Sequence, residues 1–250
     1  MTCPLTGRRV VVTRPAAQAR ELVDRLTALG AQVVELPLTR IVPIDGDAPI
    51  ATALDQIATY DVIVVTSANA ADCFADRLAA SAAALAETTK IIAVGGATAT
   101  TLQGRGVRVD RIPQRATGEA VVAELADDDL ADMRILLPRA RHGRPELPTG
   151  LRRAGAIVDD VAFYDTVRNA VEPAVVAAAL DAHDIVFTAP SGVEAFAALL
   201  SQDRQLALRI VTIGPTTTAT ARLLGFTVSS ESHEQSIDGL LEAIQSLPDP

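Results

Sequence analysis

Four segments of the first half of this 250-residue sequence return in the same order in the second half. Matched positions lie 125 residues apart near the start (14 and 139) and 119 apart near the end (95 and 214). The matched segments are 10–14 with 135–139, 30–31 with 155–156, 61–69 with 184–191, and 94–98 with 213–217. A chain built from two copies of one unit is expected to fold as two similar domains, each with its own core.

Within each copy, short apolar runs alternate with segments whose apolar residues recur at helical spacing. The runs expected as strands are 10–13, 33–36, 62–66, 91–94, 135–137, 157–161, 185–188 and 210–213. The clearest helical segments are 18–29, 70–78, 193–200 and 217–224. Continuous β-branched runs followed by helices are typical of parallel strands covered on both faces. The fold class predicted for each copy is therefore α/β.

Two segments are expected to link the domains. Residues 37–49 contain three prolines and little helical pattern, and residues 164–173 occupy the equivalent place in the second copy. If the chain crosses between domains at both, the domains are interleaved rather than sequential.

Composition excludes several classes of protein. No apolar run approaches the ~20 residues that span a bilayer, and the N-terminus lacks an apolar signal core, so we expect a cytoplasmic protein and no membrane contact. A net charge of −9 argues against nucleic acid as a partner. Cys3, Cys73 and the three histidines lack metal-ligand spacing, and no glycine-rich nucleotide loop occurs, so neither a metal nor a cofactor is expected.

Arginine dominates the basic residues, because Lys90 is the sole lysine. Arginine suits carboxylate recognition, although a coding bias toward alanine and arginine is the simpler explanation of the imbalance. Residues 134–153 hold six arginines against one glutamate, a local charge of +5. This stretch either steers a polyanion or forms a solvated surface. Arg14 and Arg139 follow equivalent strands of the two copies and are the individual candidates.

The ordered motifs resemble those of the uroporphyrinogen-III synthase family over roughly residues 9–244. They are T-R-P at 13–15, Y-D-V-I-V-V-T-S-A-N at 60–69, F-T-A-P-S-G at 187–192 and I-G-P-T-T-T at 213–218. The resemblance implies two parallel-sheet α/β domains joined by a two-stranded linker, with substrate held in the cleft between them. Carried over, the first domain is 1–37 together with 168–250, the second is 41–164, and the linkers are about 38–40 and 165–167.

The same resemblance implies a lyase (hydro-lyase) that cyclises hydroxymethylbilane to uroporphyrinogen III, with inversion of ring D and loss of water. It implies no metal and no cofactor. We also expect a monomer that makes transient contact with hydroxymethylbilane synthase.

Hydroxyl groups and glycines follow the predicted strands and open helices, whose amino ends favour carboxylates. The substrate-binding residues predicted from these positions, from the two arginines and from the family motifs are Thr13, Arg14, Thr66, Ser67, Asn69, Gly95, Thr98, Arg139, Ser191, Gly214, Thr216 and Thr217. The alternative for each hydroxyl is plain N-capping. Glycine at 95 and 214 indicates backbone approach to a ligand, a positive φ, or tight packing. Ala189 stands where many relatives carry serine.

Tyr164 is one of two tyrosines and lies where the second linker strand is expected. The resemblance implies that it faces the cleft. A phenol with a reference pKa near 10 is protonated at neutral pH and can donate to a leaving hydroxyl. Tyr164 is therefore the predicted catalytic residue, and a packing tyrosine is the alternative.

Two other functions fit the pattern less well. One is a catalytically inert tetrapyrrole-binding regulatory module of the same fold, and the other is a two-lobed small-ligand binding protein. Retention of Tyr164 and of both hydroxyl-rich loops favours the enzyme over the inert module, and the missing signal segment weighs against the binding protein.

Overall fold

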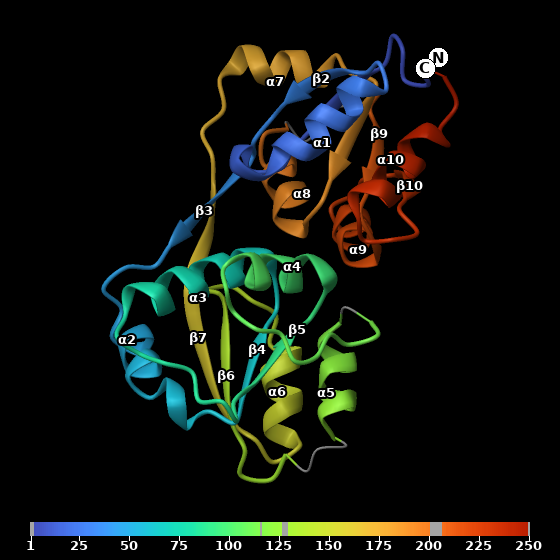
Figure 1. Ribbon diagram of the computed structural model, residues 1–250. Coiled ribbons are helices and arrows are strands. Elements are labelled where there is room, and N and C mark those ends of the chain that lie inside the picture. The colour runs from blue at the N-terminus through green and yellow to red at the C-terminus, as the bar shows by residue number, and fades with distance from the viewer. Residues whose placement is uncertain (1–2, 116, 127–129, 201–206, 250) are drawn as a thin grey trace. The chain divides into compact units, whose positions relative to one another are not determined.

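The computed structural model describes residues 3–115, 117–126, 130–200 and 207–249 (Figure 1). The chain forms two compact units: unit 1 is Met1–Arg40 with Val167–Pro250, and unit 2 is Ile41–Thr166. Each unit is built on a five-stranded sheet whose helices cover it, which confirms the predicted α/β fold class.

Unit 1 has the strand order β10-β9-β8-β1-β2. Its strands, paired in parallel throughout, are β1 (Arg9–Val12), β2 (Gln32–Glu35), β8 (Asp184–Phe187), β9 (Arg209–Thr212) and β10 (Val228–Glu231). Its helices are α1 (Ala16–Ala28), α7 (Pro173–Leu180), α8 (Pro190–Ala197), α9 (Pro215–Leu223) and α10 (Ile237–Gln245). Because neighbouring side chains of a strand point to opposite faces, Val10 packs with α1 and α10, while Val11 packs with α7, α8 and α9.

Unit 2 has the strand order β3-β7-β6-β4-β5. Its strands are β3 (Thr39–Pro43), β4 (Val62–Val65), β5 (Lys90–Ala93), β6 (Arg134–Ala140) and β7 (Ile157–Arg168). Its helices are α2 (Ala48–Asp55), the 3₁₀ turn η1 (Ile57–Thr59), α3 (Ala68–Ala80), α4 (Gly96–Gly104), α5 (Gly118–Ala126) and α6 (Glu146–Arg153). Helices α2, α3 and α4 contribute to the core on one face, and α5 and α6 to the core on the other.

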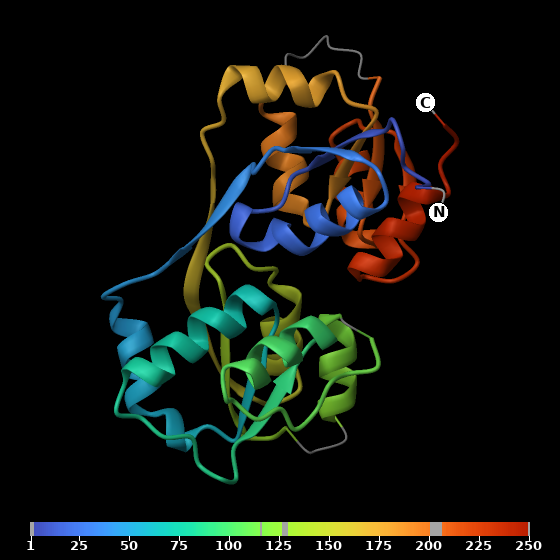
Figure 2. The same ribbon diagram turned by 45° about the horizontal axis from the view of Figure 1, so that its top comes forward.

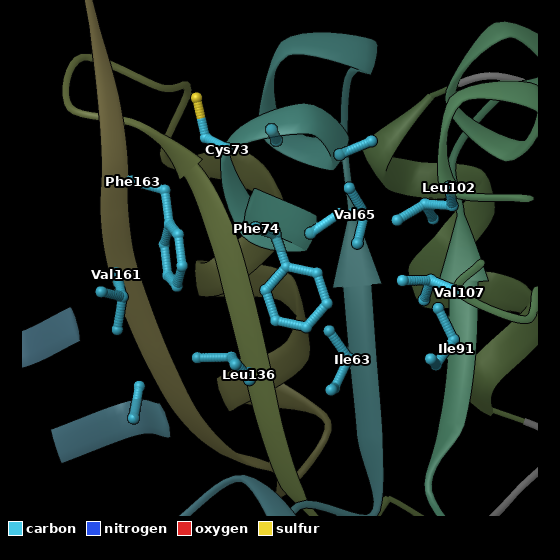
Figure 3. Packing of buried hydrophobic residues seen from close by; sticks show 14 of the residues in the cluster. Ile63, Val65, Cys73, Phe74, Ile91, Leu102, Val107, Leu136, Val161 and Phe163 are labelled. Atoms are coloured by element: carbon cyan, nitrogen blue, oxygen red, sulfur yellow. The ribbon is translucent and has the colours of Figure 1, made fainter. Parts of the chain in front are cut away.

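Phe74 of α3 lies at the centre of the first of these cores (Figure 3). Its ring meets Phe163 edge to face with centroids 5.9 Å apart, and Ile63 and Leu136 surround it. Burial of an aromatic ring of this size contributes several kcal/mol and fixes α3 against the strands.

The chain passes between the units in β3 and in β7, which are neighbours in one sheet. The amide of Ile44 donates to Phe163 O at 3.0 Å, and the amide of Asn169 donates to Leu38 O at 2.9 Å. Because partner positions run in opposite directions, the two strands are antiparallel. Segment 37–49, expected as a linker with little helical pattern, therefore contains a strand and the start of α2. Pro49 lies in the first turn of this helix, where no amide donor is needed.

In both sheets the strand order reverses at one point. In unit 1 the chain runs from β1 to β2 on one side and from β8 to β9 and β10 on the other, and in unit 2 it runs from β4 to β5 and from β6 to β7. In open α/β sheets, ligands bind outside the carboxyl ends of the strands at such a reversal. Ligand sites are therefore expected at the carboxyl ends of β1/β8 and of β4/β6.

Candidate functional site

In unit 2, two helices begin directly after neighbouring parallel strands. Ser67 follows β4 and caps α3, with its Oγ accepting a hydrogen bond from the amide of Ala70 at 3.1 Å. Gly95 follows β5 and caps α4. Helices α3 and α4 lie side by side in Figures 1 and 2, so unit 2 presents two adjacent amino-terminal helix ends. Such ends carry unpaired amides and a partial positive charge.

Tyr164 lies in β7, opposite Ala140 of β6. Its hydroxyl is 3.0 Å from Ser67 Oγ, and a side-chain interaction with Asn69 lowers the pKa of the phenol. Three residues predicted for the site are therefore brought together from two elements, Ser67 and Asn69 from the start of α3 and Tyr164 from β7.

The phenol of Tyr164 is in an unusual environment for an acid. The residue is 6% exposed and belongs to the hydrophobic core of unit 2. Burial raises the pKa of Tyr164 above its ordinary value of 10, and the hydrogen bonds from Ser67 and Asn69 act in the opposite direction. Tyr164 is therefore protonated over the whole neutral range. Its ring packs as the alternative interpretation requires, while its hydroxyl makes polar contacts at a helix terminus.

The remaining predicted residues of unit 2 are half-buried or buried. Thr66 is half-buried at the end of β4, and Thr98 is 4% exposed within α4. Gly95 has φ −154°, which is extended backbone open to any residue, so the suggestion of a positive φ there is wrong.

Arg139 ends β6 as expected but already has a carboxylate partner. Its Nε lies 2.5 Å from Asp160 Oδ1 and its Nη2 lies 2.8 Å from Asp160 Oδ2, a bidentate pair. Arg141 lies 3.4 Å from Asp165 Oδ2, and Arg134 lies 3.3 Å from Asp159 Oδ2.

Because of these ion pairs, the effective charge around residues 134–153 is lower than the +5 expected from the sequence. The three aspartates stand on β7, the strand beside β6, where a count along the sequence does not include them. They neutralise half of the six arginines, so this stretch is far less basic than its sequence suggests. The signal was present as the acidic residues of 159–165, which become relevant only once β6 and β7 are paired.

In unit 1, Thr13 and Arg14 leave β1 next to the end of β8. Thr13 is 2% exposed and its hydroxyl donates to Val186 O at 2.7 Å, so this hydroxyl holds β1 against β8. Arg14 is half-buried, and among the residues that the structure describes no carboxylate lies within salt-bridge distance of its guanidinium. Burial lowers the pKa of Arg14, and the more distant charge of Glu21 opposes this.

Helices α8 and α9 begin beside one another at the same edge of unit 1. Ser191 is half-buried in the first turn of α8, while Thr216 is exposed and Thr217 is 2% exposed in the first turn of α9. Gly214 caps α9 with φ 166°, which is extended backbone close to 180°. The suggested left-handed conformation, with its strained positive φ, is therefore wrong here too. A Cβ on Gly214 would lie 3.0 Å from Gln235 Cγ, which fits the tight-packing alternative.

Two further observations bear on the chemistry. Among the described residues, no group of three or more His, Cys, Asp or Glu side chains has the arrangement of a metal site. In the same part of the chain, no helix has both the length and the apolar character needed to cross a membrane.

Comparison with known proteins identifies the family. The family model described as uroporphyrinogen-III synthase HemD matches residues 20–242. The chain is 33% identical to the uroporphyrinogen-III synthase of Synechococcus elongatus, over 97% of this chain and 96% of that protein. It is 31% identical to the porphyrin biosynthesis protein HemD of Ruminiclostridium josui, of which it covers 50%.

Solved structures agree on the fold. The uroporphyrinogen III synthase of Thermus thermophilus (a triple mutant) superposes with a TM-score of 0.66 at 15% identity, covering 96% of this chain and 98% of that one. The enzyme of Helicobacter pylori superposes with a TM-score of 0.65 at 19% identity, covering 96% and 100%. The predictions of fold, family and enzyme class are confirmed. The chain belongs to the uroporphyrinogen-III synthase family and is a lyase of porphyrin biosynthesis.

Proposed function

We propose that this lyase closes hydroxymethylbilane into uroporphyrinogen III and that Tyr164 is the acid that assists departure of the hydroxyl group. The observation that carries the role of Tyr164 is its hydroxyl at the amino end of α3, 3.0 Å from Ser67 Oγ, beside the β4/β6 reversal of the sheet. A phenol that is neutral at physiological pH has a proton to give, and the helix terminus favours the negative charge left behind.

The phenol of Tyr164 donates its proton to the hydroxymethyl oxygen while the C–O bond breaks. Water departs, and the substrate becomes an electrophilic azafulvenium cation beside the phenolate. Ring D attacks through its substituted carbon, and the resulting spiro intermediate fragments and recloses with the ring inverted. The ring carbon that makes the final bond releases a proton, which restores the phenol, so the net loss is one water.

Orientation of the substrate is the larger task, because simple head-to-tail closure gives the type I isomer. Holding two reacting groups in one geometry can lower a barrier by ~7–11 kcal/mol. We assign this task to residues that bind the acetate and propionate groups: Arg14, Ser191, Gly214, Thr216 and Thr217 in unit 1, and Thr66, Gly95 and Thr98 in unit 2.

Arg14 has the strongest support among these residues. A half-buried guanidinium without a carboxylate partner among the described residues has lost part of its hydration. Binding of an anion compensates part of that free-energy cost. Thr13 and Arg139 have weaker support, since the first already donates to Val186 O and the second is held by Asp160. A substrate carboxylate at Arg139 would have to compete with that aspartate.

We further propose that the protein acts in the cytoplasm as a monomer and receives its substrate through transient contact with hydroxymethylbilane synthase. Cys3 and Cys73 are both free thiols, which suits a reducing compartment. A substrate that closes spontaneously to the wrong isomer favours rapid transfer from the enzyme that makes it.

The test is incubation with freshly prepared hydroxymethylbilane, without added metal or nucleotide, followed by separation of type I and type III products. We expect mainly type III. Formation of type I alone, at the rate seen without protein, would contradict the proposal, and activity abolished by a chelator would contradict the cofactor-free mechanism.

A further inference from the structure

We infer that Ser67 and Asn69 are positioning residues that donate two hydrogen bonds to the phenol oxygen of Tyr164, rather than ligands of the substrate. The inference rests on the proposed role of Tyr164 as the acid. With both donors in place, the proton of Tyr164 is free to point toward the leaving hydroxyl, and the oxygen that remains after proton transfer is already held by two donors.

The helix cap leaves Ser67 able to act as the donor in the first hydrogen bond. Ser67 Oγ accepts the amide hydrogen of Ala70 at 3.1 Å, and this fixes the rotamer of the serine side chain. Its hydroxyl hydrogen is then available for Tyr164 Oη, 3.0 Å away. A serine at an N-cap can make both bonds at once because a hydroxyl carries one donor and two acceptor sites.

The second donor stands in the first turn of the same helix. Asn69 is two residues after the cap of α3, and its side chain acts to lower the pKa of Tyr164, as a hydrogen-bond donor does. An amide NH₂ is a donor that stays neutral at every relevant pH, so it stabilises a phenolate more than it stabilises the phenol.

The amino end of helix α3 also favours the ionised form of Tyr164, because it carries a partial positive charge. Helix α3 runs for 13 residues from Ala68 to Ala80, and its amino end lies at the phenol. Desolvation of Tyr164 within the core acts against ionisation. The donors and the helix terminus offset part of that cost and so favour proton transfer from the phenol.

The composition permits a direct measurement. The chain has two tyrosines and no tryptophan, so protein labelled with 3-fluorotyrosine gives two ¹⁹F signals, and Tyr60→Phe assigns them. Fluorination makes the phenol more acidic, which brings its titration into a milder pH range. In Ser67→Ala and in Asn69→Ala the titration midpoint of residue 164 should rise by about one to two pH units. Ser67→Thr, which keeps the hydroxyl, should restore the midpoint.

Unit 1 supplies a matched control. Ser236 caps α10 by accepting from the amide of Gly239 at 3.0 Å, in the same way that Ser67 caps α3, but no tyrosine belongs to unit 1. Ser236→Ala should therefore lower the melting temperature about as much as Ser67→Ala, while leaving both ¹⁹F midpoints and kcat unchanged. Ser67→Ala should lower kcat about tenfold with KM unchanged, the change expected of a group that acts on the transition state.

A midpoint of residue 164 that stays the same or falls in Ser67→Ala would overturn the inference, because a tyrosine that donates to Ser67 becomes more acidic when that acceptor is lost. An increase of KM with unchanged kcat would also overturn it and return Ser67 to the substrate-binding residues. The ¹⁹F titration needs no turnover. It therefore decides the inference even if Tyr164→Phe retains full activity, a result that would remove only the proposed acid.

Discussion

Arg8 and Asp184 form an ion pair inside unit 1, with Nη2 2.8 Å from Oδ2 and side chains 2% and 0% exposed. The same carboxylate accepts from Arg209 Nε at 2.7 Å, and Arg8 also donates to Ile244 O at 3.0 Å. One aspartate at the start of β8 thereby fastens the start of β1, the start of β9 and the end of α10. A charge buried at this position is stable only while its oppositely charged partners are present.

Asp184→Ala is expected to destabilise the protein strongly, because the substitution leaves Arg8 charged and buried without a counter-ion. Loss of one partner from a buried pair costs about 3–5 kcal/mol. Chemical denaturation followed by circular dichroism measures this directly. Asp181→Ala is the control, since Asp181 pairs with Arg9 at an exposed site and its loss should cost no more than about 1 kcal/mol. Equal costs for the two variants would contradict the structural role of the buried pair.

Binding of product should depend on Arg14 more than on Arg139. Arg14→Ala removes a half-buried cation that no described carboxylate holds, and loss of one charge-assisted contact worth about 1.5–3 kcal/mol weakens affinity roughly 10- to 100-fold. Arg139→Ala removes a cation already held by Asp160 and should mainly lower the melting temperature. Isothermal titration with uroporphyrinogen III under anaerobic conditions compares them, and the reverse order of affinities would return Arg139 to the binding site.

The sequence predicts the buried strands well and the linking strands poorly. Residues 62–65 and 185–187 are apolar throughout because β4 and β8 lie inside their sheets, covered on both faces. β10 has the sequence V-S-S-E and lies half-exposed at the edge of its sheet, so it contains no apolar run from which the strand could be predicted. β7 continues to Arg168, past the expected end at 161. Residues 162 and 164 still pair with β6, and beyond them the strand runs beside β3, where the partly exposed Asp165 and the exposed Arg168 interrupt the apolar pattern.

The side-chain contacts of the candidate site are likewise not predictable from the sequence alone. Family motifs place Ser67 and Tyr164 in one list, but they lie 97 residues apart in sequence, and only the strand order β7-β6-β4 brings the two hydroxyls together. Arg139 and Asp160 are likewise 21 residues apart in the sequence, so the ion pair between them cannot be predicted from either segment alone. Residues that follow neighbouring strands can be predicted from a parallel sheet, whereas the partners of their side chains depend on register.

Stability should fall steeply above pH 10. Burial raises the pKa of Tyr60 and of Tyr164, and for Tyr60 the hydrogen bond to Asp159 and the charge of that carboxylate add to the effect. Below pH 10 both tyrosines are protonated in the folded and unfolded chains, so their contribution is fully present. Above pH 10 the unfolded chain ionises first, and the free energy of unfolding decreases as the pH rises toward the folded pKa values.

Tyr60→Phe checks this dependence. The variant loses the 2.6 Å hydrogen bond to Asp159 and is less stable at neutral pH, but the fall of its unfolding free energy between pH 10 and 11 should be shallower than in the parent. Few other groups interfere, because Lys90 is the sole lysine and Cys73 is the one buried thiol. Parallel curves for the parent and the variant would show that Tyr60 does not carry the alkaline loss.

Tyr164→Phe should lower kcat by about 10- to 10³-fold while KM and the melting temperature stay close to those of the parent. The phenylalanine keeps the ring in the core of unit 2 and removes only the hydroxyl that contacts Ser67. The effect is smaller than that of a full general acid, because a pyrrolic alcohol ionises readily and water can replace the phenol. Tyr60→Phe is the matched control: it deletes the other phenolic hydroxyl, which is bonded to Asp159, and should retain full kcat per folded molecule. If Tyr164→Phe keeps full kcat, or loses activity only in proportion to its melting temperature, Tyr164 is a packing residue and another group protonates the leaving hydroxyl.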